Sequence, residues 1–236
     1  MTDSEYQIIC YEEVGSTNDA ALLLSRNLKG KKVAVRAKRQ TAGRGRRGRN
    51  WQSLDGNLFF SMLRGFDLQK LGILVMSAAL AVADTIKTYD MTADVRIKWP
   101  NDVLLNGAKV CGMLLEKGAG KYMVIGIGVN ILQSPKSADM LYPTVSLREA
   151  GIVATADDFL QRYLPLFEKN LRQSAKRLRR KWLQYAKGIG SQIVVRQNGT
   201  EQTGIFEGID ENADLILRIG DKTQKILAGD VFFVED

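Results

Sequence analysis

The first 130 residues alternate between strand-like and helix-like patterns of apolar side chains. Short apolar runs bounded by turn-forming or charged residues predict strands at 6–11, 33–38, 57–63, 95–98 and 122–130. Asn106-Gly107 predicts a hairpin that joins 103–105 to 109–116. Helical periodicity predicts helices over 20–28 and 68–87, the second largely buried because it carries few charges in its middle. Ser16 and Asp19 resemble a capping box before the first helix.

The pattern changes twice in the second half of the chain. A long amphipathic stretch predicts a helical region over 155–186, bent by Pro165. Short strand patterns follow at 192–197, 203–209, 215–219 and 225–227, with a turn at Asn198-Gly199. We therefore expect an α+β fold: a mainly antiparallel sheet backed by helices in residues 1–187, and a small SH3-like β-barrel in residues 188–236.

Composition narrows the range of partners. The chain has 236 residues and 45% hydrophobic residues, enough for one sizeable domain with an appendage. Its net charge of +8 and its pI of about 9.5 favour an acidic partner or a polyanionic ligand. Nucleic acid, a nucleotide and an acidic protein all fit that charge.

Missing residue types exclude several chemistries. The chain has no histidine, which excludes Ser-His-Asp and Cys-His nucleophile systems and HExxH zinc sites. Cys10 and Cys111 lie in apolar contexts and form no CxxC pair, so we expect both to be core thiols in a reducing compartment. The N-terminus carries acidic residues without an apolar signal core, and the apolar run at 71–83 is too short to span a bilayer. A cytoplasmic protein without membrane contact is expected.

The stretch KRQTAGRGRRGRNW at 38–51 is the most unusual part of the chain. Four of its five arginines lie among three glycines at 43–49, and no acidic residue occurs between Ala20 and Leu54. Arginine supplies a fixed fork of donors that matches carboxylate and phosphate, and glycine lets the backbone approach a ligand closely. We expect this arginine loop, residues 41–50, to be mobile until it closes over a negatively charged ligand.

Three other interpretations of the arginine loop can be weighed from the sequence. Gly43, Gly45 and Gly48 satisfy GxGxxG, but a strand pattern follows them where a dinucleotide site needs a helix, so a Rossmann site is excluded. A protein kinase would need a histidine in its catalytic loop. An arginine-rich nucleic-acid-binding segment remains open, and it predicts strongly salt-dependent binding.

Five motifs in order resemble those of the biotin–protein ligases. They are Ser16-Thr17-Asn18, Gln40 ahead of GRGRRGRNW, KWPND at 98–102, KVCGMLLE at 109–116 and GIGVN at 126–130. The resemblance covers most of residues 11–132 and implies a class II synthetase-like catalytic domain. It implies that ATP and Mg²⁺ convert biotin to biotinyl-5′-AMP, after which biotin passes to a lysine of a biotin carboxyl carrier domain of a biotin-dependent carboxylase.

The resemblance also implies a monofunctional ligase. About fifteen residues precede Ser16, where some family members carry a DNA-binding helix-turn-helix, so we expect no repression and no DNA partner. A homodimer through exposed sheet edges is possible. Lipoate ligases and octanoyl transferases share the fold class, but their motif includes a histidine that this chain lacks.

The roles that the resemblance implies fall into three groups. Biotin's ureido ring and its surroundings would be bound by Ser16, Thr17, Asn18, Gln40, Gly45 and backbone groups of Arg44 and Arg46, with Gly112 leaving space for biotin. Arg44 and Lys109 would be catalytic, meeting the biotin carboxylate and the α-phosphate, and Arg46 would meet the other phosphates. Trp51 would cover the adenine, and Asn101 and Asn130 would contact its edge. Asp102, Arg47 and Arg49 are expected to be structural or electrostatic, and no metal ligand is assigned.

Overall fold

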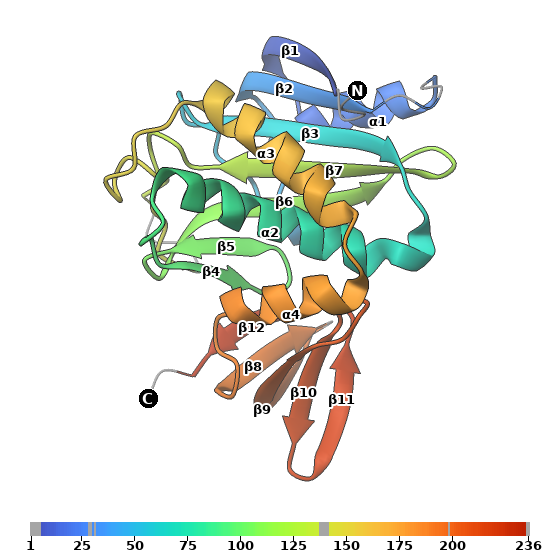
Figure 1. Ribbon diagram of the computed structural model, residues 1–236, viewed down its shortest axis with the longest axis vertical. Coiled ribbons are helices and arrows are strands. Elements are labelled where there is room, and N and C mark those ends of the chain that lie inside the picture. Colours follow the sequence, from blue (N-terminus) through green and yellow to red (C-terminus); the bar gives the residue numbers. More distant parts are fainter. Residues whose placement is uncertain (1–5, 28–29, 31, 137–141, 198, 235–236) are drawn as a thin grey trace.

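A computed structural model describes residues 6–27, 30, 32–136, 142–197 and 199–234. These residues form two sheets, one of seven strands and one of five, with helices packed beside them (Figure 1). The α+β architecture with a mainly antiparallel sheet is confirmed. The SH3-like comparison for the smaller sheet stays a prediction.

The seven-stranded sheet provides the platform for the site. Its order is β1-β2-β3-β7-β6-β5-β4, and every neighbouring pair is antiparallel except β1 and β2. The strands are β1 Gln7–Val14, β2 Val33–Gln40, β3 Leu58–Gly65, β4 Val95–Lys98, β5 Asp102–Leu105, β6 Ala108–Lys117 and β7 Tyr122–Val129.

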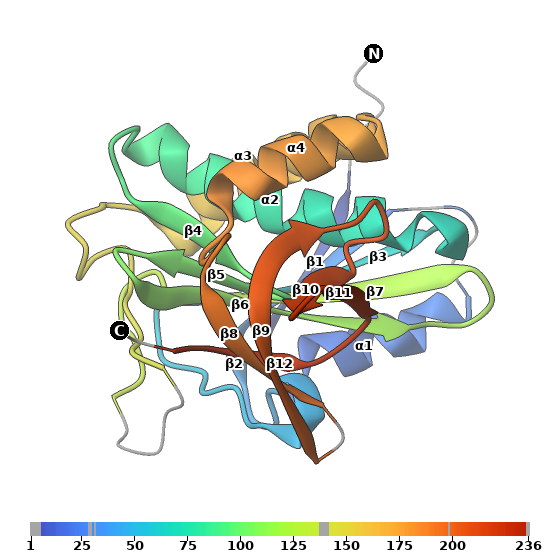
Figure 2. The ribbon, with the colours of Figure 1, turned by 90° about the horizontal axis from the view of Figure 1, so that it is seen from below.

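Helices cover the two faces of this sheet unequally. Figure 2 shows α2 (Leu71–Tyr89), α3 (Ala156–Leu171) and α4 (Ala175–Tyr185) on one face, and α1 (Thr17–Ser25) on the other. Strand alternation explains this: Ala34 and Met62 enter the main core, whereas the neighbouring Val35 and Leu63 pack in a small cluster beneath α1. The second face is therefore open beyond α1.

Helix α2 is the central helix of the core. By length and composition it is the one described helix that could cross a membrane. About 67% of it is buried inside the molecule, as in a core helix. It packs against α3 and α4, and its alanine-rich surface lets them approach closely.

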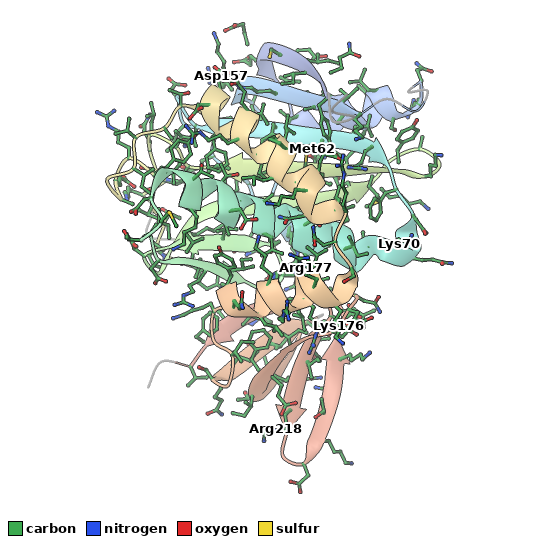
Figure 3. All side chains as sticks on the ribbon, viewed as in Figure 1. Met62, Lys70, Asp157, Lys176, Arg177 and Arg218 are labelled. Atoms are coloured by element: carbon green, nitrogen blue, oxygen red, sulfur yellow. The ribbon has the colours of Figure 1, made fainter. Side chains whose placement is uncertain are left out.

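The five-stranded sheet packs below the first one. Its order is β11-β10-β9-β8-β12, all antiparallel. The strands are β8 Gln192–Gln197, β9 Thr200–Ile209, β10 Leu215–Ile219, β11 Lys222–Ile226 and β12 Asp230–Phe233. In Figure 3, Lys176 and Arg177 mark the start of α4 at the junction of the sheets, and Arg218 lies far out on the smaller one.

Direct contacts join the two sheets. The Trp99 indole N–H donates to the Ala213 carbonyl at 2.8 Å, and the Lys187 backbone N–H donates to the Ile97 carbonyl at 2.9 Å. Apolar side chains from both sheets belong to one continuous buried cluster, which includes Phe206 and Leu217. The smaller sheet is thus held firmly beside the open face of the larger one.

Several local predictions were wrong. The first helix begins at Thr17 rather than Ala20 and ends at Ser25, and Leu28 lies outside the described residues. Ser16 precedes this helix, but its side chain makes no capping hydrogen bond, and the Asp19 carboxylate pairs with Arg44 instead of completing a capping box. Cys10 is exposed because β1 is an edge strand, whereas Cys111 is buried as expected.

The predicted helical region over 155–186 is also different. It consists of two helices separated at Arg172–Ser174, whereas Pro165 lies within α3. Ser174 starts the second helix by accepting a hydrogen bond from the Arg177 backbone N–H, which makes the break a capped boundary. Strand β12 was not predicted, and Asn198 of the predicted turn lies outside the described residues.

Candidate functional site

A floor of glycines lies on the open face of the seven-stranded sheet. Gly112 of β6 pairs with Gly128 of β7, and Gly126 lies two residues earlier on β7. A Cβ at Gly126 would overlap the Asn18 amide, and a Cβ at Gly128 or Gly112 would overlap the Trp51 indole. The sequence indicated space beside β7, and side chains of the site itself occupy it.

Uncharged polar side chains form one end of the site. The backbone N–H and the hydroxyl of Thr17 donate to the Gln40 side-chain oxygen at 2.9 and 3.0 Å. Ser61 of β3 donates toward the Thr17 hydroxyl and the Asn18 oxygen at 2.7 and 2.6 Å. Ser16 is buried next to them, so the start of α1, β2 and β3 together present a fixed set of donors and acceptors.

The arginine loop folds as a small hairpin above this floor. The Trp51 N–H donates to the Gly43 carbonyl at 2.9 Å, and the Gly45 N–H donates to the Arg49 carbonyl at 2.7 Å. Arg47 and Gly48 form its tip, both with positive φ, 55° and 73°. In a two-residue hairpin turn with both φ angles positive, glycine adopts its φ without strain, whereas the backbone of the other residue, here Arg47, is strained. The turn sets the directions in which the arginines of the loop project.

The first two arginines of the loop face different partners. Arg44 contacts Asp19 at 2.5 Å and Glu116 at 3.2 Å, and these carboxylates, Asp19 first, raise the pKa of its guanidinium. Arg46 donates to the Asn101 side chain at 3.2 Å and to the Gly229 carbonyl at 3.1 Å. Burial lowers the pKa of Arg46, and the adjacent Arg47 and Arg49 add to that effect.

Lys109 projects into the middle of the site. Its Nζ lies 2.8 Å from an Asp102 carboxylate oxygen and 5.4 Å from the centre of the Trp51 ring system. The angles at that carboxylate oxygen do not make a hydrogen bond, so the contact is an ion pair that a better-aligned anion can replace. Trp51 Nε1 is also buried and has no hydrogen-bond partner among the described residues.

Lys98 is a second cation in the site, at the end of β4. Its Nζ lies 2.9 Å from the centre of the Tyr142 ring and near the rings of Phe232 and Phe233. Burial lowers the pKa of Lys98 to about 7, and Asp102 offsets only part of that effect. The residue is 4% exposed, so its charge is expensive to keep in this place.

The two asparagines are held by backbone carbonyls. The Asn101 amide nitrogen donates to the Met113 carbonyl at 2.8 Å, and its oxygen accepts from Arg46. The Asn130 amide nitrogen lies 3.1 Å from the Val145 carbonyl and 3.4 Å from that of Lys109. Both donors are already engaged, so each side chain has a fixed orientation.

A single cavity of about 470 Å³ brings these groups together. The residues that the sequence analysis singled out for biotin, ATP or catalysis all line it, namely Ser16, Thr17, Asn18, Gln40, Arg44, Gly45, Arg46, Trp51, Asn101, Lys109, Gly112 and Asn130. The cavity size suits a small organic ligand. Within the described residues no group of three or more metal-ligating side chains occurs.

Sequence reasoning missed five residues of the site. They are Ser61, Lys98, Glu116, Tyr142 and Asp230. Ser61 is a polar residue in an otherwise apolar strand, which could have indicated a site residue. Lys98 and Glu116 lie within the motifs at 98–102 and 109–116. Nothing in the sequence near Asp230 indicates that its carboxylate reaches a loop 181 residues away.

Comparisons with known proteins agree with this geometry. The family model described as "Biotin/lipoate A/B protein ligase family" matches residues 11–130, and "Biotin protein ligase C terminal domain" matches residues 188–234. The chain is 38% identical to the biotin–[acetyl-CoA-carboxylase] ligase of Paracoccus denitrificans, over 92% of this chain and 97% of that one.

Two further proteins extend the likeness. The biotin–[acetyl-CoA-carboxylase] ligase of Mycobacterium tuberculosis is 34% identical over 95% of this chain and 88% of its own length. A solved structure of the Aquifex aeolicus biotin protein ligase in complex with biotin and ATP superposes with a TM-score of 0.83 at 26% identity, covering 98% and 99% of the two chains. The chain described here therefore belongs to the biotin/lipoate A/B protein ligase family and carries the C-terminal domain of its biotin protein ligases.

Proposed function

We propose that biotin and ATP react in this cavity to give biotinyl-AMP and pyrophosphate. Biotin is then transferred to a lysine of a biotin carrier domain. One observation carries the proposal: a single cavity has uncharged polar groups at one end and converging cations at the other. Biotin has that polarity, with a neutral ureido ring and a carboxylate. The chain is an ATP-dependent biotin ligase, and the residue roles below are our assignment.

At the polar end, Ser16, Thr17 and Gln40 are assigned to the ureido ring. Thr17 and Gln40 are bonded to each other and Ser61 donates to Thr17, so these two side chains are oriented before ligand arrives. Gly45 and the backbone of Arg44 and Arg46 close over the ring from the loop side. Gly112 leaves room for the Trp51 indole, which would line biotin's path to the centre.

At the centre, Arg44 and Lys109 are assigned as catalytic residues. A carboxylate oxygen of biotin attacks the α-phosphorus of ATP, the bond from that phosphorus to the bridging oxygen breaks, and pyrophosphate leaves with the electron pair. Both reactants are anions, so positive charge and held geometry lower the barrier more than a protein nucleophile would. Lys109 can leave Asp102 for the phosphate, and Arg46 can meet the departing phosphates.

At the far end, Trp51, Asn101 and Asn130 are assigned to the adenine. The Trp51 indole N–H is buried without a partner among the described residues, and its ring offers a flat apolar surface. Asn101 and Asn130 keep their orientation through backbone carbonyls, so their remaining oxygen sites face the cavity in fixed positions.

Mg²⁺ is proposed to enter with ATP. The carboxylates that line the cavity, Asp102 and Asp230, are too few for a resident metal centre but fit an ion already held by phosphates. Asp102 is the candidate ligand, because Asp230 is engaged by arginines. Bound there, the ion would neutralise phosphate charge as the anhydride forms.

In the second step the acceptor's ε-amine attacks the biotinyl carbonyl carbon. The carbon–oxygen bond of the mixed anhydride breaks, AMP leaves, and an amide forms. The relatives from P. denitrificans and M. tuberculosis are named for acetyl-CoA carboxylase, so we assign the biotin carrier domain of such a carboxylase as the acceptor.

Further proposals concern the whole chain. We assign residues 1–187 to catalysis and 188–236 to a separate C-terminal domain, supported by the matched ranges. We expect cytoplasmic action without DNA or membrane, since relatives named only as ligases match over most of their length. A homodimer that pairs exposed sheet edges is compatible with this fold.

Transfer of labelled biotin tests the function. With ATP and Mg²⁺, the full chain should label a purified biotin carrier domain, and a carrier whose target lysine is replaced by arginine should stay unlabelled. Labelling with lipoate in place of biotin would favour a lipoate ligase. Salt-sensitive binding to nucleic acid without any label transfer would favour the nucleic-acid interpretation.

A further inference from the structure

Three arginines of the loop converge on one carboxylate of the smaller sheet. Asp230, the first residue of β12, lies 2.9 Å from Arg47, 3.0 Å from Arg49 and 3.8 Å from Arg46. Two carbonyls of the same sheet add to this contact: Gly229 accepts from Arg46, and Arg196 accepts from Arg47, both at 3.1 Å.

The charges at this contact do not balance. One carboxylate faces three guanidinium groups, so positive charge remains beside the cavity, which Arg46, Arg49 and Asp230 all line. The Asp230 side chain is only 14% exposed, so water weakens its attraction less than at an open surface. The contact holds the loop closed and still leaves cationic charge for phosphates.

Asp230 attaches the arginine loop to the second sheet. The arginine loop leaves β2 of the larger sheet and reaches across to β12 of the smaller one (Figure 2). Its backbone bonds attach Thr41 and Ala42 to Val14 and Gly15 at the start of the loop and close the hairpin, but they do not attach the tip at Arg47 and Gly48 to the described residues of the smaller sheet. A carbonyl accepts from neutral and charged donors alike, so Asp230 supplies the charge-dependent part of the attachment to the smaller sheet. On the other side of the loop, Arg44 pairs with Asp19 and Glu116.

We propose that Asp230 is a positioning residue that keeps the arginine loop closed while biotinyl-AMP waits for the acceptor. The proposal rests on the function proposed above. If the loop opens early, water adds to the biotinyl carbonyl carbon, the carbon–oxygen bond of the anhydride breaks, and biotin and AMP are released. An intermediate that escapes can acylate the amine of any nearby protein in the same way, again with loss of AMP.

The ratio of AMP formed to biotin transferred measures this leak. Full-length wild type and Asp230→Asn are mixed with biotin, MgATP, the carrier domain and serum albumin as a bystander. We expect a ratio near one for the wild type, and about threefold or higher for Asp230→Asn, with label on albumin. Asp210→Asn is the matched control, since Asp210 lies in the turn between β9 and β10 of the same sheet and is as exposed as Asp230, but pairs with Lys225.

Two more variants separate positioning from a structural role. Asp230→Glu keeps the charge and should restore a ratio close to that of the wild type. Replacing Arg47 and Arg49 by Met removes the partners from the loop side and should raise the ratio as Asp230→Asn does, so this result tests the inference even if Asp230→Asn fails to fold. Trypsin should also cut within the loop several-fold faster in Asp230→Asn than in the wild type when biotin and MgATP are present. The double arginine variant lacks two of the loop's trypsin sites, so it is followed by its AMP-to-biotin ratio alone.

The inference would be overturned by an unchanged ratio in Asp230→Asn together with trypsin cleavage like that of the wild type, or by an unchanged ratio in the double arginine variant. That result is distinct from failure of the proposed function. If the wild type forms no biotin-dependent AMP at all, the function is wrong, whereas normal coupling in every variant removes only the role of Asp230.

Discussion

At the scale of single residues, the site depends on where positive charge is buried. Lys98 and Lys109 lie in the same cavity, but Lys109 is paired with Asp102, whereas Lys98 is surrounded by aromatic rings. Burial penalises the charge of Lys98 more than the rings and Asp102 support it, which is why its pKa falls to about 7.

Lys98 should make the stability of the protein rise with pH. Between about pH 7 and its ordinary pKa of 10.5, the unfolded chain holds a proton here that the folded chain has lost. Unfolding therefore becomes harder as pH increases, by at most about 1.4 kcal/mol per pH unit from this group. Urea unfolding at pH 7 and pH 9 should show this gain in the wild type, and Lys98→Met should lack it.

The control for that measurement is Lys187→Met. Lys187 is exposed and also lies near the Phe233 ring, so it removes a lysine without removing a buried charge. It should keep the pH dependence of the wild type. Equal pH dependence in the wild type and Lys98→Met would show that Lys98 does not titrate in this window.

The sequence predicted which residues form the site better than how they contact one another. The resemblance of the ordered motifs to those of the biotin–protein ligases was sufficient to select Thr17, Gln40 and Lys109, which all line the cavity. It could not indicate that Gln40 orients Thr17, or that Asp230 binds the arginine loop. Such pairings depend on tertiary distance, which no local pattern records.

At the scale of elements, the paired glycines of β6 and β7 decide what the sheet can hold. The register places Gly112 opposite Gly128, and both are covered by the Trp51 indole. Periodicity predicted these strands, but it could not show that Trp51, which follows the arginine loop, covers the glycines. Strand β12 was missed because Val231, Phe232 and Phe233 are consecutive apolar residues that show no alternation.

Gly128→Ala should displace Trp51 without unfolding the sheet. The added methyl group would overlap the indole, so the ring must move from its place beneath the proposed adenine position. Biotin-dependent AMP formation should fall on the order of tenfold, chiefly through a higher KM for ATP. Steady-state kinetics over a range of ATP concentrations measures this change.

Gly65→Ala is the matched control for Gly128→Ala. Gly65 ends the neighbouring strand β3, and the nearest group to an added Cβ is the flexible Lys121 side chain at 3.3 Å. Its kinetics should stay close to those of the wild type. If Gly128→Ala also leaves the KM for ATP unchanged, Trp51 does not form part of the nucleotide site.

At the scale of the whole molecule, the smaller sheet completes the site and the core together. Its apolar side chains belong to the main buried cluster, and Asp230, the first residue of β12, contacts the arginine loop. The sequence predicted a small strand-rich region that leans on the rest. The extent of the contact could not be predicted, because it involves side chains such as Trp99 that read locally as part of a turn.

Gly72→Ala tests the contact between the smaller sheet and α2, because the free energy of unfolding should fall if the two pack closely and rise if they do not. Alanine normally stabilises a helix relative to glycine by about 0.5–1 kcal/mol. Here a Cβ would lie 2.5 Å from backbone atoms of Glu211 and Asn212, in the turn between β9 and β10, which cannot move without shifting the smaller sheet. We expect a loss of about 1–3 kcal/mol in the free energy of unfolding, measured in urea, and a gain in stability would show that the sheets do not pack this closely.

The measurement that tests the central claim most directly is biotin-dependent exchange of labelled pyrophosphate into ATP. It isolates the first step, in which Arg44 and Lys109 are proposed to bring two anions together. The wild type should exchange label only when biotin is present, and Lys109→Ala, folded as judged by circular dichroism, should lose the rate on the order of a hundredfold or more. Exchange that needs no biotin, or that persists near the wild-type rate in Lys109→Ala, would contradict the account.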